Sequence, residues 1–318
     1  MTSLALTLFW IGVTIIVYTY LGYGLVIYLL SKFKSHSKSL FQEDANLPEV
    51  TILIAAYNEE QVIEDKIKNT LALDYPQDRL TVFIVTDGST DNTPQIVKKF
   101  HAVKLFHEPQ RKGKIHAVNR VMKWVSTPIV IFSDANTTVN REGVRNIVRH
   151  YQDETVGGVA GEKRIFKKSE DNASGSGEGL YWKYESFLKK KDSDVYSVVG
   201  AAGELFSIRT ALYQEPEDNI IIEDFYLSLR IAARGYRFIY EPDAYAMETA
   251  SASVEEEWKR KVRICAGGFQ AMGKLKELLN PFTYGILSFQ YISHRVLRWT
   301  LAPFFLPIVF LSSVWLAT

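Results

Sequence analysis

The sequence predicts an α/β fold, with a mixed, mainly parallel sheet and flanking transmembrane helices. Between residues 48 and 136, short apolar runs alternate with segments of helical periodicity, a pattern typical of a doubly wound sheet. Long stretches near both ends of the chain carry no charged residue. The 318 residues are 47% hydrophobic, enough for one large core or two smaller ones.

The N-terminal stretch, residues 4–30, has no charged side chain, and about 20 apolar residues suffice to cross a bilayer. Lys32, Lys34 and Lys38 follow directly. A cleaved signal peptide is the alternative, but no basic residue precedes the apolar run, which is also long for such a peptide. We therefore predict a transmembrane helix over residues 1–31.

A second uncharged stretch covers residues 299–318 and is predicted to be a C-terminal transmembrane segment. Pro303 and Pro307 within it keep a buried core helix as the alternative. Arg295 and Arg298 precede it, so basic clusters at both ends border the central region. The positive-inside rule then places that region in the cytoplasm.

Residues 45–275 are predicted to form this cytoplasmic domain, and residues 276–298 an interfacial helix. The latter segment is aromatic-rich with few charges, which suits a helix lying in the membrane interface. A plain soluble helix is the alternative.

The central region begins with four predicted strands, each followed by a helix or a polar segment. The strands are expected at 50–58, 80–89, 103–108 and 128–136, and the helices at 59–73, 92–101 and 113–125. Ligands of such sheets bind at the carboxyl ends of the strands. Polar side chains follow those ends: Asn58, Glu59, Asp87, Asp134 and Asn136.

Some functions are disfavoured. No Gly-x-Gly-x-x-Gly follows the first strand and no Walker lysine motif occurs, so neither a dinucleotide cofactor nor a P-loop is expected. With 37 Lys and Arg against 36 Asp and Glu, no nucleic-acid partner is expected. The single cysteine, Cys265, excludes an intrachain disulfide and favours a reducing compartment.

After the fourth strand the pattern changes. Residues 167–180 are predicted to be a polar loop, followed by an aromatic-rich helix. Residues 200–208 indicate a glycine-lined strand or loop, and an amphipathic helix opens at Glu223.

Asp134 and Asn136 are candidate metal ligands. Strand alternation would point both side chains the same way, and a carboxylate with an amide oxygen suits a hard divalent ion that also holds phosphates. An Asp/Asn turn that closes the strand is the equal alternative.

Asp87 is a candidate ligand-binding carboxylate at a strand end. The following Gly88 lets a ligand approach the backbone, and the carboxylate can accept hydrogen bonds from a base or ribose. Asp91 and Thr93 are better explained as helix caps.

Two basic segments are candidate phosphate sites. Lys114 follows Gly113 at a helix start, where cations and N–H groups favour phosphate, whereas Arg111 and Lys112 are better explained as a solvated turn. Arg260 and Arg263 share a helix face and could hold a diphosphate. A basic helix on the membrane surface is the alternative for that pair.

Glu223 and Asp224 follow three isoleucines, and burying acids beside apolar surface is costly unless they have a partner or a role. Capping of the helix is the plain structural alternative.

Taken in the order in which they occur along the chain, these motifs closely resemble those of membrane-bound family 2 glycosyltransferases. This group includes cellulose, chitin, hyaluronan and poly-N-acetylglucosamine synthases. The resemblance covers about Pro48 to Gln270. It implies the GT-A fold, a Rossmann-like nucleotide half joined to an acceptor half. It also implies a nucleotide-sugar donor with a uridine base, a divalent metal (Mg²⁺ or Mn²⁺) and a place in the bacterial inner membrane.

The resemblance also implies roles for single residues. Asp224 matches the general base, with Glu223 orienting it or binding the acceptor. Asp134 matches the first Asp of the metal motif, and Asn136 stands where the family has a second Asp. The implied substrate-binding residues are Ala56, Tyr57, Glu59, Asp87, Lys114, Gly203, Arg260 and Arg263.

One departure bears on the product. Where processive members carry Gln-x-x-Arg-Trp, this chain has Arg260, Arg263 and Ile264. The family's Trp stacks on the acceptor sugar, so Ile264 favours a single addition over a long chain.

Three hypotheses follow. The first is an inverting, metal-dependent transferase that extends a saccharide or lipid-linked acceptor at the bilayer. The second is a single-addition enzyme that loads a polyprenyl-phosphate-type lipid carrier. The third is a degenerate fold that binds a nucleotide sugar or a partner without turnover, against which the joint presence of Asp87, Asp134, Asp224 and Arg263 argues.

Overall fold

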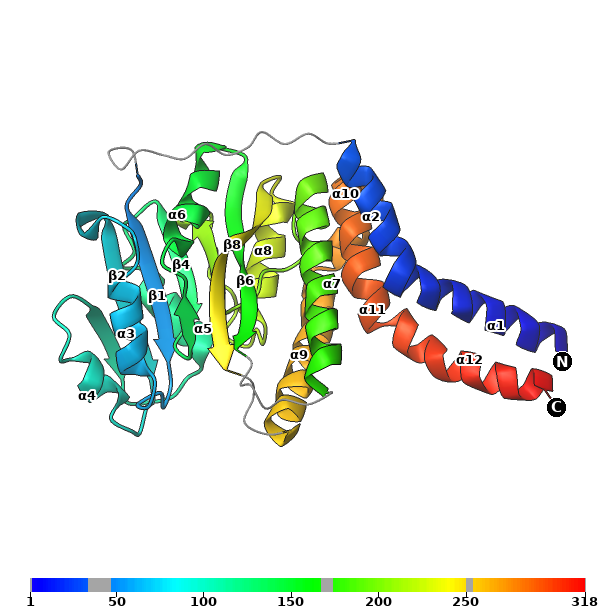
Figure 1. Ribbon diagram of the computed structural model, residues 1–318, viewed down its shortest axis with the longest axis horizontal. Helices are drawn as coiled ribbons and strands as arrows, with labels where there is room; N and C mark the ends of the chain where they lie inside the picture. The colour runs from blue at the N-terminus through cyan, green and yellow to red at the C-terminus, as the bar shows by residue number, and fades with distance from the viewer. Residues whose placement is uncertain (1, 34–46, 167–173, 250–253, 318) are drawn as a thin grey trace.

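The computed structural model describes residues 2–33, 47–166, 174–249 and 254–317. An eight-stranded sheet with helices on both faces forms the body, and the two ends of the chain form a helical arm that projects from it (Figure 1).

The strands are β1 Val50–Ala56, β2 Leu80–Asp87, β3 Lys104–Glu108, β4 Ile129–Asp134, β5 Thr137–Val139, β6 Val156–Phe166, β7 Leu205–Arg209 and β8 Arg237–Thr249. They lie in the order β3-β2-β1-β4-β7-β6-β8-β5. β3, β2, β1 and β4 are mutually parallel, as are β6 and β8, whereas β7 is antiparallel to both neighbours and β5 is antiparallel to β8. The predicted mixed, mainly parallel sheet is thereby confirmed.

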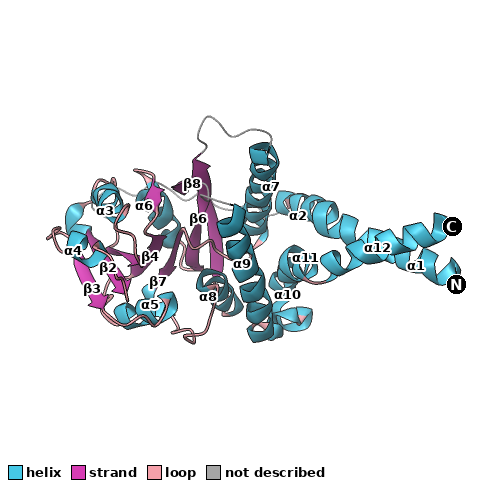
Figure 2. Ribbon diagram, turned by 90° about the horizontal axis from the view of Figure 1, so that it is seen from below, coloured by secondary structure: helices cyan, strands magenta, loops and turns pink. Residues whose placement is uncertain are grey.

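The helices of the body are α3 Ile63–Leu71, α4 Thr93–Val97, α5 Lys114–Met122, α6 Gly143–Val148, α7 Ser174–Val195, α8 Glu223–Ala233 and α9 Val254–Lys274. α3 and α6 cover one face of the sheet, and α5 and α8 the other (Figure 2). Ile52 of β1 packs in the first layer, while Leu53 packs in the second. Burial on both faces explains why the central strands are almost continuously apolar.

The first four strands and three helices lie where the sequence predicts them, trimmed by a few residues at their ends. The predicted polar loop at 167–180 is wrong from Ser174 onward, because α7 begins there; residues 167–173 lie outside the described chain. Residues 200–204 form a loop, and β7 begins at Leu205.

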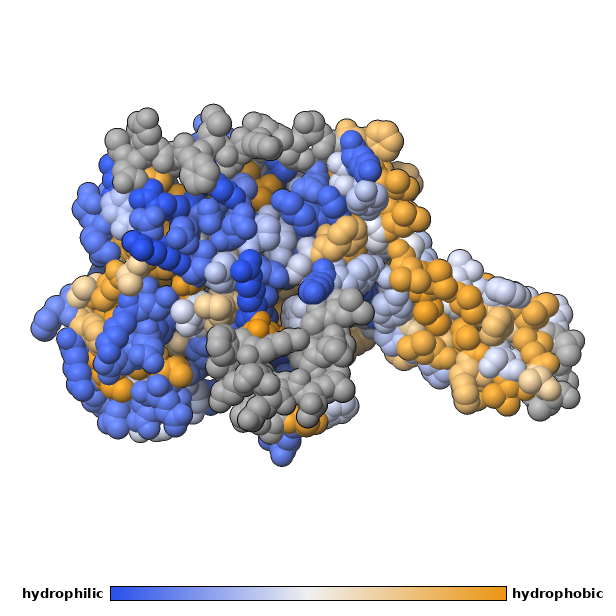
Figure 3. Space-filling view, in the orientation of Figure 1, coloured by the Kyte–Doolittle hydropathy of each residue, from blue (hydrophilic) through white to orange (hydrophobic). Residues whose placement is uncertain are grey.

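The helical arm combines α1 Thr2–Val17 and the π-helical turn Tyr18–Gly22 with α12 Leu301–Ala317, which lie side by side (Figures 1 and 2). Gly12 permits this approach, since a Cβ there would lie 2.5 Å from Val309 Cγ2. The arm exposes mostly apolar side chains (Figure 3). Such a surface is costly in water and suits a lipid environment.

By length and composition, one helix of the described chain could cross a membrane, Ser3–Lys32, which includes α2 Tyr23–Lys32. The number rises to two if the bent pair Pro281–Trp299 and Leu301–Ala317, which meets at 49°, counts as one span.

The segment predicted to lie in the membrane interface consists of η6 Lys276–Leu279, α10 Pro281–Tyr291, η7 Ile292–Val296 and α11 Leu297–Trp299. Leu287 and Tyr291 are buried in a cluster with Phe225 of α8, whereas Phe282 is 99% exposed. The segment thus packs on the body along one side, and its contact with a membrane stays a prediction.

Candidate active site

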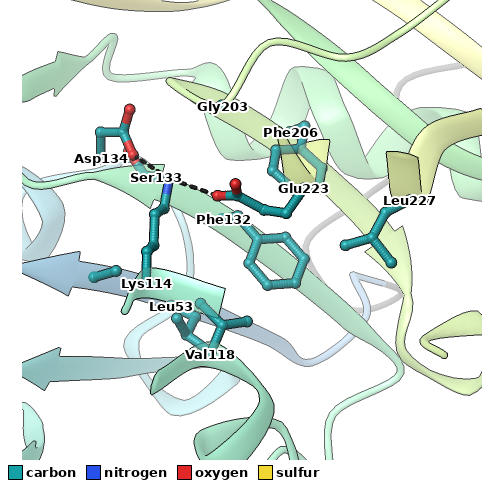
Figure 4. A pocket seen from close by; sticks show the side chains of 11 residues that line it. Leu53, Lys114, Val118, Phe132, Ser133, Asp134, Gly203, Phe206, Glu223 and Leu227 are labelled. Carbon is teal, nitrogen blue, oxygen red and sulfur yellow. Dashed lines mark hydrogen bonds and ion pairs between the residues drawn. The ribbon is translucent and has the colours of Figure 1, made fainter. Parts of the chain in front are cut away.

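Lys114 is the centre of the candidate site. It is the first residue of α5, and its Nζ lies 2.8 Å from Asp134 Oδ1 and 2.8 Å from Glu223 Oε1 (Figure 4). Asp134 is the last residue of β4 and Glu223 the first of α8. Three elements that are distant in sequence therefore meet at this ammonium group.

The two carboxylates set the charge states here. Desolvation lowers the pKa of Lys114, but Asp134 and Glu223 outweigh it and raise that pKa well above its ordinary value. Burial by itself would raise the pKa of Glu223. The charge of Lys114 outweighs this effect and leaves the pKa of Glu223 below its usual range. Lys114 is thus held as a cation and Glu223 as an anion.

Asp224 behaves differently from its neighbour. Burial, reinforced by the adjacent charge of Glu223, raises the pKa of Asp224 to about 7. Gly203 lies against it, since a Cβ at Gly203 would be 3.5 Å from Asp224 Oδ2 and 3.8 Å from Lys114 Nζ. A carboxyl group that titrates near neutral pH in a cleft is a candidate acid or base.

Asp87, at the end of β2, is only 5% exposed. Its Oδ2 accepts hydrogen bonds from the backbone N–H groups of Lys112 (2.8 Å) and Gly113 (2.7 Å). Its Oδ1 is buried and has no hydrogen-bond partner within the described ranges. One oxygen therefore orders the 111–113 loop, and the other is a buried acceptor whose hydrogen-bonding capacity is unused.

Tyr57 and Arg111 form a stacked pair beside this carboxylate. The Arg111 guanidinium carbon lies 3.7 Å from the centroid of the Tyr57 ring. Arg111 and Lys112 are exposed and lie outside any helix or strand, as the prediction of a solvated turn requires, and Arg111 in addition stacks on Tyr57. Gly88, with φ +69°, makes room for the loop, because a Cβ there would lie 2.4 Å from Arg111 Cβ.

Glu59 follows the loop after β1, of which Ala56 is the last residue. Burial, with the charges of Asp134 and Asp91, raises the pKa of Glu59. Asp91 Oδ1 accepts from the N–H of Thr93 (3.0 Å), and Thr93 Oγ1 accepts from the N–H of Glu59 (2.8 Å). The capping prediction agrees with the contact of Asp91, which accepts from the first N–H of α4, but it is wrong for Thr93, which is itself the first residue of that helix and bonds to Glu59 instead.

The two predicted metal ligands, Asp134 and Asn136, lie at the turn between β4 and β5. Asn136 lies beyond the end of β4, so strand alternation does not govern its direction, and its Nδ2 donates to Glu248 Oε1 (3.1 Å). No group of three His, Cys, Asp or Glu side chains in the described chain could hold a metal. A carboxylate and an amide oxygen nevertheless suit Mg²⁺ or Mn²⁺ when substrate phosphates supply the remaining ligands.

Lys66 of α3 was missed by the sequence reasoning. It is 3% exposed, and its Nζ donates to Ser133 Oγ (2.7 Å) and to the carbonyl oxygen of Thr137 (2.9 Å). Burial lowers its pKa to about 7. Its place on the apolar face between Ile63 and Ile67 was the available signal. Lys66 holds the turn that carries Asp134.

The two arginines of α9 differ in their contacts. Arg260 pairs with Glu257 (2.9 Å) and lies 3.9 Å from Glu248, while Arg263 is exposed and helps to lower the pKa of Glu223. Both line the same open cavity.

That cavity has a volume of about 460 Å³ and is bounded by α7, α8, α9 and α11. Besides Lys114, Asp134, Glu223 and Asp224, its lining includes side chains that the sequence analysis did not assign to a site. These are Tyr181, Trp182, Glu185 and Lys189 of α7, Arg295 of η7 and Trp299 of α11.

A family model described as "Glycosyl transferase family 2" matches residues 51–215, slightly more than half of the chain. The chain belongs to glycosyltransferase family 2. It is therefore a glycosyltransferase, and the expectation from the motif order is confirmed.

Curated relatives include poly-beta-1,6-N-acetyl-D-glucosamine synthases. That of Staphylococcus aureus (strain COL) is 29% identical over 242 residues, which cover 72% of this chain and 57% of the relative. That of Staphylococcus epidermidis is 26% identical over 261 residues, covering 78% of this chain and 62% of the relative. The chain thus spans about three fifths of the length of these relatives.

Solved structures agree on the fold. The mannosyltransferase PcManGT from Pyrobaculum calidifontis, in complex with GDP-Man and Mn²⁺, superposes with a TM-score of 0.75 at 25% identity, covering 96% of this chain and 87% of that one. Staphylococcus aureus TarS 1–349 in complex with UDP-GlcNAc has a TM-score of 0.53 at 19% identity, covering 77% and 72%. The GT-A fold predicted from the resemblance is confirmed.

Proposed function

We propose that the protein is an inverting, metal-dependent glycosyltransferase that moves a sugar from a UDP-sugar to the hydroxyl of a saccharide acceptor at a membrane. The observation that carries this proposal is the cluster around Lys114. It brings a metal-type carboxylate, Asp134, into the same cavity as Asp224, a carboxyl group with a pKa of about 7.

Donor binding is assigned to the carboxyl ends of β1, β2 and β4. The buried Oδ1 of Asp87 would accept a hydrogen bond from the base or ribose, beside the ring of Tyr57. Ala56 and Glu59 would complete this nucleotide side. Lys114 would lie near the diphosphate and the sugar.

Asp134 and Asn136 would hold a divalent metal together with the donor diphosphate. When bound, such a metal stabilises negative charge on the departing diphosphate. PcManGT is described with Mn²⁺, which supports this assignment. Arg263 and Arg260 line the same cavity and would add positive charge near the departing diphosphate.

The transfer itself is assigned to Asp224. Its carboxylate would accept the proton of the acceptor hydroxyl while that oxygen bonds to the anomeric carbon and the bond to the diphosphate breaks. A single displacement of this kind inverts the configuration. Glu223, held as an anion by Lys114, would orient the acceptor and keep the pKa of Asp224 high.

A saccharide acceptor is favoured over direct loading of a polyprenyl-phosphate-type carrier. Both sets of curated relatives cited above are polysaccharide synthases by name. Trp299 lines the same cavity as Ile264 and brings to it, from another helix, an indole that Ile264 does not provide. The exposed apolar arm supports attachment to a bilayer, with the sheet domain proposed to face the cytoplasm of a bacterial inner membrane.

The proposal is tested by measuring release of nucleoside diphosphate from UDP-GlcNAc, UDP-Glc and GDP-Man, with Mg²⁺, with Mn²⁺ and with EDTA. We expect release from a UDP-sugar that EDTA abolishes and added metal restores. Full turnover in EDTA would contradict the metal assignment, and turnover of GDP-Man alone would contradict the uridine assignment. No release from any donor would overturn the proposed function.

A further inference from the structure

Helix α7 presents a polar and aromatic face to the cavity. Trp182, Glu185 and Lys189 follow one another at spacings of three and four residues, so they lie on one side of the helix. Glu185 pairs with Arg295 (2.6 Å), which lines the cavity as well. Lys189, in contrast to Glu185, has no ion-pair partner among the described residues.

Lys189 is unusual among the cavity lysines. It is only 5% exposed, yet its Nζ makes no hydrogen bond and no ion pair with any described residue, and it lies 5.9 Å from the centroid of the Tyr240 ring. Lys114, Lys163 and Lys261 each pair with a carboxylate. An ammonium group that lines the cavity and has no protein partner keeps its donors for a ligand.

The position of Lys189 connects it with the reacting groups. Burial raises the pKa of Glu204, but Lys163 and, more weakly, Lys189 lower it below its usual value. Glu204 in turn adds to the effects of burial and of Glu223 that raise the pKa of Asp224. The Lys189 ammonium therefore lies within electrostatic reach of the acids at the active-site end of the cavity.

Aromatic rings in the same cavity indicate what its ligand is. Trp299 packs beside Phe225, with ring centroids 5.2 Å apart, and against Gly268, where a Cβ would lie 2.8 Å from the indole. Trp182 and Tyr181 line the cavity from α7. Indole rings offer flat apolar surface to a sugar ring, and an ammonium group donates up to three hydrogen bonds to hydroxyl or acetamido oxygens. This combination favours a saccharide over a bare phosphate.

We propose that Lys189 is an acceptor-binding residue, whose ammonium group holds the terminal sugar of a saccharide acceptor between Trp182 and Trp299. This inference rests on the proposed glycosyltransferase function and names a residue that acts on the acceptor side alone. The donor side, at Asp87 and Asp134, does not involve it.

The test uses the full chain in detergent micelles with UDP-GlcNAc and a panel of oligosaccharides of β-1,6-linked N-acetylglucosamine, of glucose and of mannose. The variants are Lys189→Met, Lys189→Arg and, as the matched control, Lys190→Met, whose side chain is 50% exposed. The measurements are the KM for acceptor, the KM for donor and the release of UDP without acceptor. A melting temperature for each variant reports on folding.

We expect Lys189→Met to raise the acceptor KM by about 10- to 100-fold, the worth of a charged hydrogen bond, with the donor KM and acceptor-independent hydrolysis within about twofold of the parent. Lys189→Arg should recover most of the affinity, and Lys190→Met should leave it unchanged.

Three results would overturn the inference: an unchanged acceptor KM in Lys189→Met, an equal fall of hydrolysis and transfer in that variant, or a parent that hydrolyses donor but neither binds nor extends any saccharide of the panel. A parent that releases no nucleotide from any donor would instead defeat the proposed function.

Discussion

Asp224 and Glu223 are adjacent in sequence but differ in charge state. Lys114 lies 2.8 Å from Glu223 and keeps it ionised, while the half-buried Asp224 lies beside that negative charge with a pKa of about 7. A base is most effective when its pKa lies near the working pH, which supports the proposal that Asp224 is the base and that Glu223 is held in place by Lys114. The consequences can be measured at the level of these single residues.

The acid–base assignment predicts the pH dependence of transfer. The carboxylate form of Asp224 is the active one, so kcat/KM should rise about tenfold per pH unit below about 7 and level off above it. Glu223→Gln removes the neighbouring charge and should move the profile toward acid pH. A profile that is flat between about pH 5 and pH 8 would contradict the assignment.

Asp224→Asn keeps the size of the side chain but removes its basicity. Transfer should fall by about 10²- to 10⁴-fold while donor binding survives, because donor contacts are assigned to Asp87, Glu59 and the metal ligands. Asp78→Asn, at an exposed position, is the control. A folded variant that transfers within a few-fold of the parent rate would defeat the role of Asp224 as base.

The same change should stabilise the fold. A pKa raised in the folded state means that ionised Asp224 destabilises the protein increasingly from about pH 4 to pH 7 and by a constant amount above. At pH 8 the neutral Asn should therefore raise the melting temperature, by about 2–4 °C for each kcal/mol recovered. An Asp224→Asn variant that loses transfer activity but has a higher melting temperature cannot be explained by misfolding.

At the scale of elements, the turn between β4 and β5 depends on a side chain from α3. Lys66 donates to Ser133 and Thr137, and Thr137 Oγ1 donates to the carbonyl oxygen of Asp134 (2.9 Å). Asp134, the carboxylate that is proposed to bind metal, is thus held in place by α3, the helix that follows the loop after β1. A helix, a strand end and a turn form one unit.

Lys66→Met tests this unit. It leaves the buried acceptors at Ser133 and Thr137 without their donor, which should cost about 1–3 kcal/mol in the free energy of unfolding. The donor KM should rise with it, because Asp134 loses its support. Lys68→Met, whose parent side chain is 60% exposed, should change neither quantity. Unchanged donor KM in a destabilised Lys66→Met variant would show that the turn is held by other contacts.

At the scale of the whole molecule, a buried polar cluster joins α2 and the α10–η7 segment, which border the helical arm, to α7 of the body. Asp192 of α7 is fully buried; it accepts a hydrogen bond from Tyr23 of α2 and lies 2.5 Å from His294 Nδ1. Gln290 of α10 donates to the Asp192 backbone carbonyl (2.8 Å). Segments next to both helices of the arm therefore meet at one carboxylate, close to the ion pair of Glu185 and Arg295 that lines the cavity.

Asp192→Ala removes the centre of this cluster. It leaves Tyr23 and His294 buried without their acceptor, so the free energy of unfolding should fall by about 3–5 kcal/mol. Asp194→Ala, which removes a partly exposed carboxylate paired with Lys191, should cost less than about 1 kcal/mol. Denaturation in detergent micelles measures both. Equal effects from the two changes would show that the cluster does not anchor the arm.

The sequence by itself determined the features that depend on local chemistry. Short apolar runs predicted β1, β2, β3 and β4, of which β3 is a partly exposed edge strand, and helical periodicity predicted the helices between them. The order of Asp87, Lys114, Asp134 and the Glu223–Asp224 pair indicated the family, because each follows a strand end or opens a helix. Such positions can be read from side-chain spacing alone.

Only the tertiary structure decided which side chains became partners across the chain. Lys66 looks like an ordinary helix lysine until α3 places it under the β4–β5 turn, and nothing in the sequence shows that the exposed Arg111 stacks on Tyr57. The same holds for Lys189 and Trp299, which share a cavity although they lie on separate helices. Hydrogen bonds and ion pairs act over a few ångströms, so they are decided by how distant elements pack, which local spacing does not encode.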